Sequence, residues 1–94
     1  MQGHTPIGKQ TGLTVAGTAV SLTVPTGAKP RAATVQVFEA SVRFWLDGSV
    51  PTATTGHRAD IGDLIQLESS AEVVNFKVIR ETSTSASVEV TYYG

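Results

Sequence analysis

The stretch VRFWLDGSVPTATTGH, residues 42–57, gives the clearest indication of the fold. Apolar and polar positions alternate along residues 42–46, and a period of two is that of an extended strand. Asp47-Gly48 then favours a turn, because the aspartate can bond its own backbone ahead and glycine accepts a positive φ. Pro51 has no N–H for a ladder, so the strand must end before it or lie at a sheet edge. The stretch predicts a rigid β-corner with Arg43 and Trp45 on its outward face.

Similar short segments recur along the rest of the chain, separated by turn residues at regular spacing. The expected strands are residues 13–15, 20–24, 33–38, 42–46, 64–68, 74–80 and 86–93. No window has a convincing helical period, and threonine-rich strands with serine-rich turns fit β-structure. This pattern predicts an all-β fold, an antiparallel β-sandwich or small barrel of about seven strands.

The apolar positions that share a face within these segments predict the core. They are Val35, Val37, Val42, Phe44, Leu46, Leu67, Val74, Phe76, Val78, Val88 and Val90. A chain of 94 residues can bury one thin core of this kind and no more.

Two parts of the chain differ in character. Residues 1–11 are polar and broken by glycine and proline, so we expect a flexible N-terminal arm that could reach a neighbouring subunit. Residues 12–94 are expected to form a single β-sandwich domain. The N-terminus has no apolar h-region, which predicts no signal peptide. No apolar run approaches the length of a membrane helix, so we expect no membrane partner.

Charge and cysteine content narrow the class of partner. The net charge is −1, with acidic and basic residues scattered along the chain and no basic block, so we expect no nucleic-acid partner. The chain has no cysteine, which favours folding in a reducing cytoplasm.

The sequence contains no motif for catalysis. His4 and His57 lie far apart, and neither has further ligands at the spacing of a metal site. Asp60 and Asp63 are near His57, but two acidic residues in a loop are interpreted as solvated side chains rather than as metal ligands. No nucleophile elbow, phosphate loop or placed pair of carboxylates is present. We therefore predict that the protein is not an enzyme and needs no cofactor or metal.

Five residues are the candidates for a contact surface. They are Arg43, Trp45, His57, Arg58 and Tyr93. Trp, Tyr and Arg dominate binding hot spots, and the irregular stretch 51–62 is a loop of the kind that carries function on a rigid scaffold. Two interpretations of Trp45 stay open: it lies partly covered beneath a loop, or it forms part of an interface, including one with a second copy.

Two resemblances follow from these residues. Residues 44–52, FWLDGSVPT, resemble the corner "Y-T-x-D-G-S-x-P-T" of fibronectin-III-associated and chitobiase C-terminal domains, with Phe44 at the Tyr position and Trp45 at the Thr position. Those domains are small β-sandwich accessory modules. The likeness covers about a tenth of the chain and implies a corner more than an activity.

Over roughly the C-terminal two-thirds, the chain resembles small proteins of tailed bacteriophages whose genes lie near the capsid genes. The likeness is carried by residues 47–53, by Gly56-His57, by Gly62-Asp63 with Leu64 and Leu67, and by residues 90–93. Such proteins are virion components, including head decoration or cement proteins. The resemblance implies a β-rich subunit that oligomerises and binds the outside of a shell.

Two hypotheses from different classes result. The first is a non-enzymatic virion structural protein, a capsid decoration, cement or head-associated subunit. It would be made in the host cytoplasm and localised to the virion. Its partners would be itself, with a trimer as the first expectation, and the major capsid protein or another virion protein. The second is a carbohydrate-binding accessory module that uses Trp45 as a stacking platform.

Overall fold

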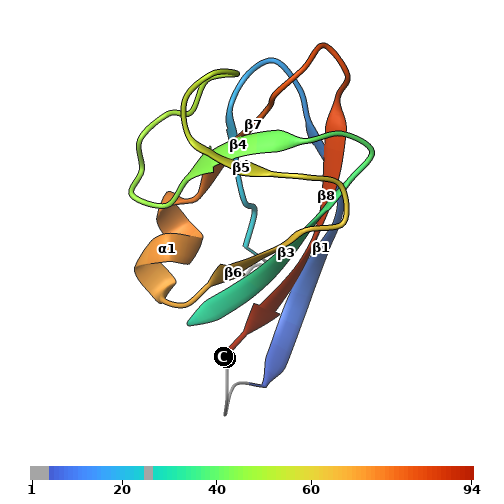
Figure 1. Cartoon of the computed structure of the whole chain (residues 1–94). Coiled ribbons are helices and arrows are strands. Elements are labelled where there is room, and N and C mark those ends of the chain that lie inside the picture. The colour runs from blue at the N-terminus through green and yellow to red at the C-terminus, as the bar shows by residue number, and fades with distance from the viewer. Residues whose placement is uncertain (1–4, 25–26) are drawn as a thin grey trace.

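A computed structural model of the chain describes residues 5–24 and 27–94. The strands are β1 (Pro6–Val15), β2 (Val20–Ser21), β3 (Ala32–Phe38), β4 (Val42–Trp45), β5 (His57–Ala59), β6 (Leu64–Leu67), β7 (Lys77–Arg80) and β8 (Ala86–Tyr93), and α1 spans Ser70–Asn75. They form two antiparallel four-stranded sheets, in the orders β1-β8-β3-β6 and β2-β7-β4-β5. The sheets face each other as two layers (Figure 1), which confirms the all-β sandwich and excludes the closed barrel.

The core lies between the sheets because every second side chain of a strand points to the same face. Along β3 the inward positions are Ala33, Val35 and Val37, and along β4 they are Val42 and Phe44. Most of the predicted core is therefore confirmed. Leu46 is partly buried and packs against the core rather than lying within it.

The prediction for Val74 is wrong. Val74 belongs to α1 and is 71% exposed, whereas Val73 is buried. The Ser69 hydroxyl accepts the Glu72 N–H at 3.2 Å and so caps the helix, and β7 begins only at Lys77. Ser69-Ser70-Ala71-Glu72 matches the Ser-x-x-Glu signature of a helix start, which outweighs the apparent alternation of Val74 with the residues that follow.

The expected N-terminal arm is also wrong for the residues that the structure describes. Pro6 to Thr11 form the first part of β1, which pairs with β8, and Thr5 and Gly94 exchange backbone hydrogen bonds of 2.9 and 3.3 Å. The segment was predicted as irregular because its strand contains two register breaks and two glycines that interrupt the period. Residues 1–4 lie outside the described part of the chain.

Candidate interaction surface at the open edge of the sandwich

Four of the five predicted contact residues come together because β4 and β5 are neighbours. Arg43 lies opposite Arg58, and Phe44 lies opposite His57. Arg43 and Trp45 take the outward positions of β4, as the alternation predicts. The predicted loop 51–62 is partly wrong, since His57–Ala59 within it form β5, the edge strand of this sheet.

Tyr93 does not belong to this group. It is the last residue of β8 and pairs with Pro6 and Ala32 in the other sheet. The sequence offers no means of seeing this, because Trp45 and Tyr93 both end an alternating segment with an outward aromatic. Only the strand order separates them.

The aromatic side chains of β4 meet His57 at the edge. The ring centroids of Trp45 and His57 are 5.2 Å apart with an edge-on angle of 68°, and those of Phe44 and His57 are 5.5 Å apart. Trp45 is half-buried, so it is neither part of the core nor a fully exposed platform. His57 is exposed and stands beside the two rings.

Glu81, which follows β7, holds the two arginines and was not predicted. Its carboxylate accepts hydrogen bonds from Arg43 Nε at 2.8 Å, Arg58 Nε at 2.7 Å and the Ser41 hydroxyl at 2.8 Å. The Ser41 hydroxyl and then the Arg58 guanidinium, with a smaller share from Arg43, lower the pKa of Glu81 to about 2. A glutamate in a serine- and threonine-rich turn gives no signal for this role, because it depends on β7 lying next to β4.

Arg58 is fully engaged by acidic partners. Its NH1 and NH2 groups donate to the two carboxylate oxygens of Asp60, each at 2.7 Å, while its Nε donates to Glu81. These carboxylates raise the pKa of Arg58 above its usual range. A bidentate pair of this geometry fixes the guanidinium plane, so Arg58 acts as a clamp between β5 and β7 rather than as an available cation.

The loop between β4 and β5 has the predicted turn chemistry. Gly48 has a φ of 90°, and the Asp47 carboxylate accepts the Ser49 N–H at 3.0 Å, which lowers the pKa of Asp47. Gly56 has a φ of 124°, and a Cβ there would lie 3.1 Å from the carbonyl oxygen of Phe44. Its own carbonyl accepts a hydrogen bond from Arg43 at 3.0 Å, so β5 is held closely against β4.

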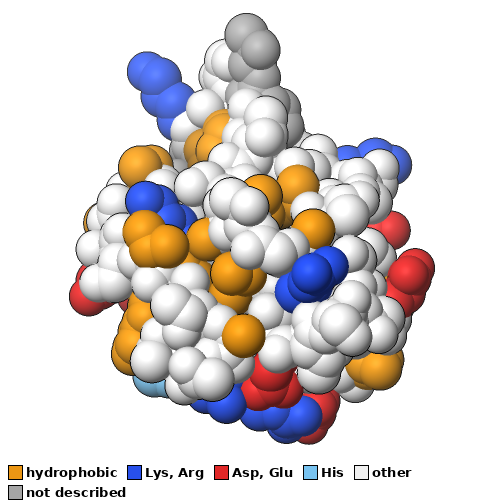
Figure 2. Space-filling model, turned by 90° about the horizontal axis from the view of Figure 1, so that it is seen from above, with side chains coloured by type: hydrophobic (Ala, Val, Ile, Leu, Met, Phe, Trp, Pro, Cys, Tyr) orange, Lys and Arg blue, Asp and Glu red, His pale blue; other side chains and the backbone are white. Residues whose placement is uncertain are grey.

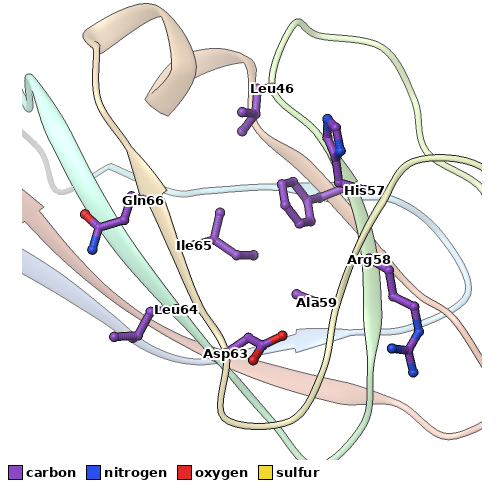
Figure 3. A pocket seen from close by; sticks show the side chains of 9 residues that line it. Leu46, His57, Arg58, Ala59, Asp63, Leu64, Ile65 and Gln66 are labelled. Atoms are coloured by element: carbon purple, nitrogen blue, oxygen red, sulfur yellow. The ribbon is translucent and has the colours of Figure 1, made fainter.

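A cleft of about 440 Å³ lies between β5 and β6, the edge strands of the two sheets. It is lined by Phe44, Leu46, His57, Arg58, Ala59, Asp63, Leu64, Ile65 and Gln66. Figure 3 shows Ala59 and Ile65 between the two strands, with Arg58 pointing away from the space between them. This volume is within the range of about 300–1,000 Å³ usual for ligand sites.

The turn that joins β5 to β6 closes one end of the cleft. The Asp63 carboxylate accepts the Asp60 N–H at 2.8 Å, and the Gly62 N–H donates to the Val37 carbonyl at 2.7 Å. Ile61 at this turn is 61% exposed and Leu64 on β6 is 57% exposed. The edge therefore displays two large apolar side chains at a cleft that both apolar and polar residues line.

The charges in this region are mixed rather than of one sign. Figure 2 shows basic and acidic side chains interleaved at one rim of the molecule, with hydrophobic atoms scattered over the face.

Within residues 5–24 and 27–94 no group of three or more His, Asp or Glu side chains is arranged to hold a metal ion. In the same part of the chain, no helix has the length and apolar character needed to cross a membrane. Comparison with protein-family models, with curated proteins and with solved structures finds no match. The functional proposal therefore depends on the residues of this chain alone.

Proposed function

We propose that this chain is a non-enzymatic structural protein of a bacteriophage virion, a capsid decoration or other head-associated subunit that binds the outer surface of the shell. The observation that carries the proposal is the position of the segments behind the phage resemblance. Residues 47–53 form the loop after β4, Gly56-His57 opens β5, and Gly62-Asp63 leads into β6. His57, Asp63 and Leu64 line the edge cleft, so three of the residues behind the resemblance lie at one surface, while residues 90–93 lie in β8.

Such a subunit would act by surface burial and multivalency. Ile61 and Leu64 offer apolar contact area at the edge, and the remaining surface supplies modest contacts that several linked subunits would multiply. We propose self-association, with a trimer as the expected state, because a small domain with a thin core gains stability from assembly. Light scattering of the purified protein should give a mass that is a multiple of the monomer mass. A monomer at high micromolar concentration would contradict this part of the proposal.

Co-sedimentation with phage shells tests the main proposal. The protein is expected to pellet with assembled shells and not to bind isolated capsid subunits. Isolated subunits lack the sites that form where neighbouring subunits meet, and they provide no avidity. Deletion of residues 1–11 is not a suitable test variant, since it would remove the first part of β1. Absence of binding to assembled shells at saturating concentration would count against the proposal.

Carbohydrate binding is the second candidate, favoured by the aromatic group of Trp45 and His57 beside the cleft. In that case polysaccharide retention should be lost in Trp45→Ala, because stacking on one ring would carry the affinity. The matched control is Tyr93→Ala, which removes an outward aromatic from the other sheet. Glycan retention that Trp45→Ala abolishes and Tyr93→Ala preserves, without shell binding, would replace the virion proposal.

A further inference from the structure

We propose that the edge between β5 and β6 takes up an extended segment of a partner protein as an added β-strand. The segment is apolar at alternate positions and basic at its ends. This names the kind of partner that the proposed virion subunit contacts, and its biological setting rests on that proposed function.

The first support is the backbone of β6. The Val37 N–H donates to the Asp63 carbonyl at 3.1 Å, and in the same register Ile65 lies opposite Val35. Hydrogen-bonded and non-bonded pairs alternate in antiparallel sheets, so Ile65 turns its backbone groups toward β3. The N–H and C=O groups of Leu64 and Gln66 then point out of the sheet, where an added strand can bond them.

The second support is the difference between the two edges of this sheet. At the opposite edge, β1 contains Pro6, Lys9 and two register breaks, which are the devices that discourage edge pairing. β6 is a regular strand with no proline, lysine or register break among its residues, and it exposes Leu64. The two edges therefore differ, because β1 carries proline, lysine and register breaks and β6, a strand of four residues, carries none of these.

The third support is the chemistry of the space beside β6. Phe44, Leu46 and Ile65 line the cleft, and every second side chain of an added strand would point toward them. Apolar residues at alternate positions of the partner segment fit this pattern. The cleft is flanked on its far side by β5, which is itself an edge strand.

The negative charge at the two ends of β6 favours a partner segment whose own ends are basic. Arg58 is engaged by Asp60 and Glu81, whereas neither Asp63 nor Glu68 forms a salt bridge with any described residue. These two carboxylates stand just before and just after β6, so the unbalanced charge at the edge is negative. Antiparallel pairing with β6 of a second copy would bring like charges together, which favours a different chain as the partner.

Amide chemical shifts of the isotope-labelled full chain test the inference. The probe is a short synthetic peptide with valine at alternate positions and lysine at both ends, and the controls are the same peptide with glutamate for lysine and with N-methylated valines. The lysine peptide is expected to shift amides of β5 and β6, above all Leu64 and Gln66, and to saturate. The glutamate peptide should bind about tenfold more weakly. The N-methylated peptide should not bind, because it cannot complete the ladder.

A pair of protein variants locates the contact. Leu64→Lys is expected to weaken the lysine peptide about tenfold or more, since it removes an apolar contact and adds a like charge. Val50→Lys is the matched control, because Val50 is 63% exposed and does not line the cleft. Its affinity should stay within about twofold of the wild type. Equal binding of all three peptides, shifts confined to other strands, no shifts, or equal effects of the two variants would overturn the inference.

The two proposals can fail separately. Shell binding that Leu64→Lys leaves unchanged, together with no peptide binding, would leave the virion function and remove the added strand. Peptide binding at β5 and β6 without shell binding would keep the strand site and remove the virion function.

Discussion

Glu39 adopts a backbone conformation that residues with a Cβ rarely hold. Its φ is 75°, and the Ala40 N–H donates to the Phe38 carbonyl at 2.9 Å, so β3 and β4 are joined through a tight γ-turn. The left-handed region costs an L-residue roughly 1–2 kcal/mol. This strain is stored at the entry to β4, the strand that carries Arg43 and Trp45.

Glu39→Gly is therefore expected to stabilise the protein. It removes the Cβ penalty but gives the unfolded chain extra freedom that costs about 0.5–1 kcal/mol, so the net gain is about 0–1.5 kcal/mol. Chemical denaturation measures the change in the free energy of unfolding. Glu39→Ala keeps the Cβ and serves as the control. A Glu39→Gly protein less stable than Glu39→Ala would contradict the strain at this turn.

Position 56 requires glycine for two reasons: its φ is positive, and the backbone of Phe44 leaves no room for a Cβ. A Cβ at this position would approach the backbone of Phe44 to 3.1 and 3.2 Å. Gly56→Ala should therefore destabilise the protein by about 1–3 kcal/mol, the usual cost of overpacking, in addition to its φ penalty. Gly62→Ala separates the two costs, because Gly62 also has a positive φ but a Cβ there meets nothing within 4 Å. Equal losses of stability in the two variants would show that the contact with β4 does not matter.

At the scale of elements, α1 shows where alternation misleads. Val74, Phe76 and Val78 occupy alternate positions in the sequence. Val74 nevertheless lies exposed in α1, while Phe76 and Val78 belong to the core. The pattern alone cannot separate these cases over so few residues, whereas the Ser-x-x-Glu start provides a capping signal. β3 and β8 were predictable to within a residue, because their alternation is long and both have one face buried.

Two alanine substitutions distinguish the helix from the predicted long strand. Phe76 is fully buried and its ring centroid lies 5.6 Å from that of Phe44, so Phe76→Ala should cost about 3–5 kcal/mol. Val74→Ala should change the free energy of unfolding by less than about 0.5 kcal/mol, because the side chain is exposed. Thermal or chemical denaturation of both variants gives the comparison. A large loss in Val74→Ala would restore the strand interpretation, in which both side chains face the core.

At the scale of the whole molecule, strand order decides which residues form the site. The period of β4 predicts that Arg43 and Trp45 point outward, and this is confirmed. It does not predict that β7 lies beside β4 and so brings Glu81 to the arginines, nor that β8 carries Tyr93 in the other sheet. Sheet order depends on long-range packing, which a local pattern does not contain. The cleft was likewise beyond prediction, because its walls are edges of two different sheets.

Strand order also brings together the groups that set the dependence of stability on pH. Glu81 joins β4, β5 and β7, and its pKa is lowered from 4.5 to about 2. A carboxylate with a depressed folded-state pKa stabilises the protein above its unfolded pKa, and this contribution is lost as pH falls from about 4.5 to about 2. Glu81→Gln should thus be less stable than the wild type at neutral pH. The difference should vanish near pH 2.

Tyr92 is expected to make the stability of the protein fall at alkaline pH, whereas Glu81 makes it fall at acidic pH. Its hydroxyl lies 3.1 Å from Gln10 Oε1 and 3.0 Å from the Thr23 carbonyl, and burial raises its pKa from 10.0 to about 12. The folded protein then holds a proton that the unfolded chain releases, so the contribution of Tyr92 to stability falls as pH rises from 10 to 12. Tyr92→Phe should cost about 1 kcal/mol at neutral pH through the lost hydrogen bond. Urea denaturation across this pH range measures the difference between the two proteins, which should shrink with rising pH. A constant difference would mean that Tyr92 titrates alike in the folded and unfolded chains, contrary to its burial between the sheets.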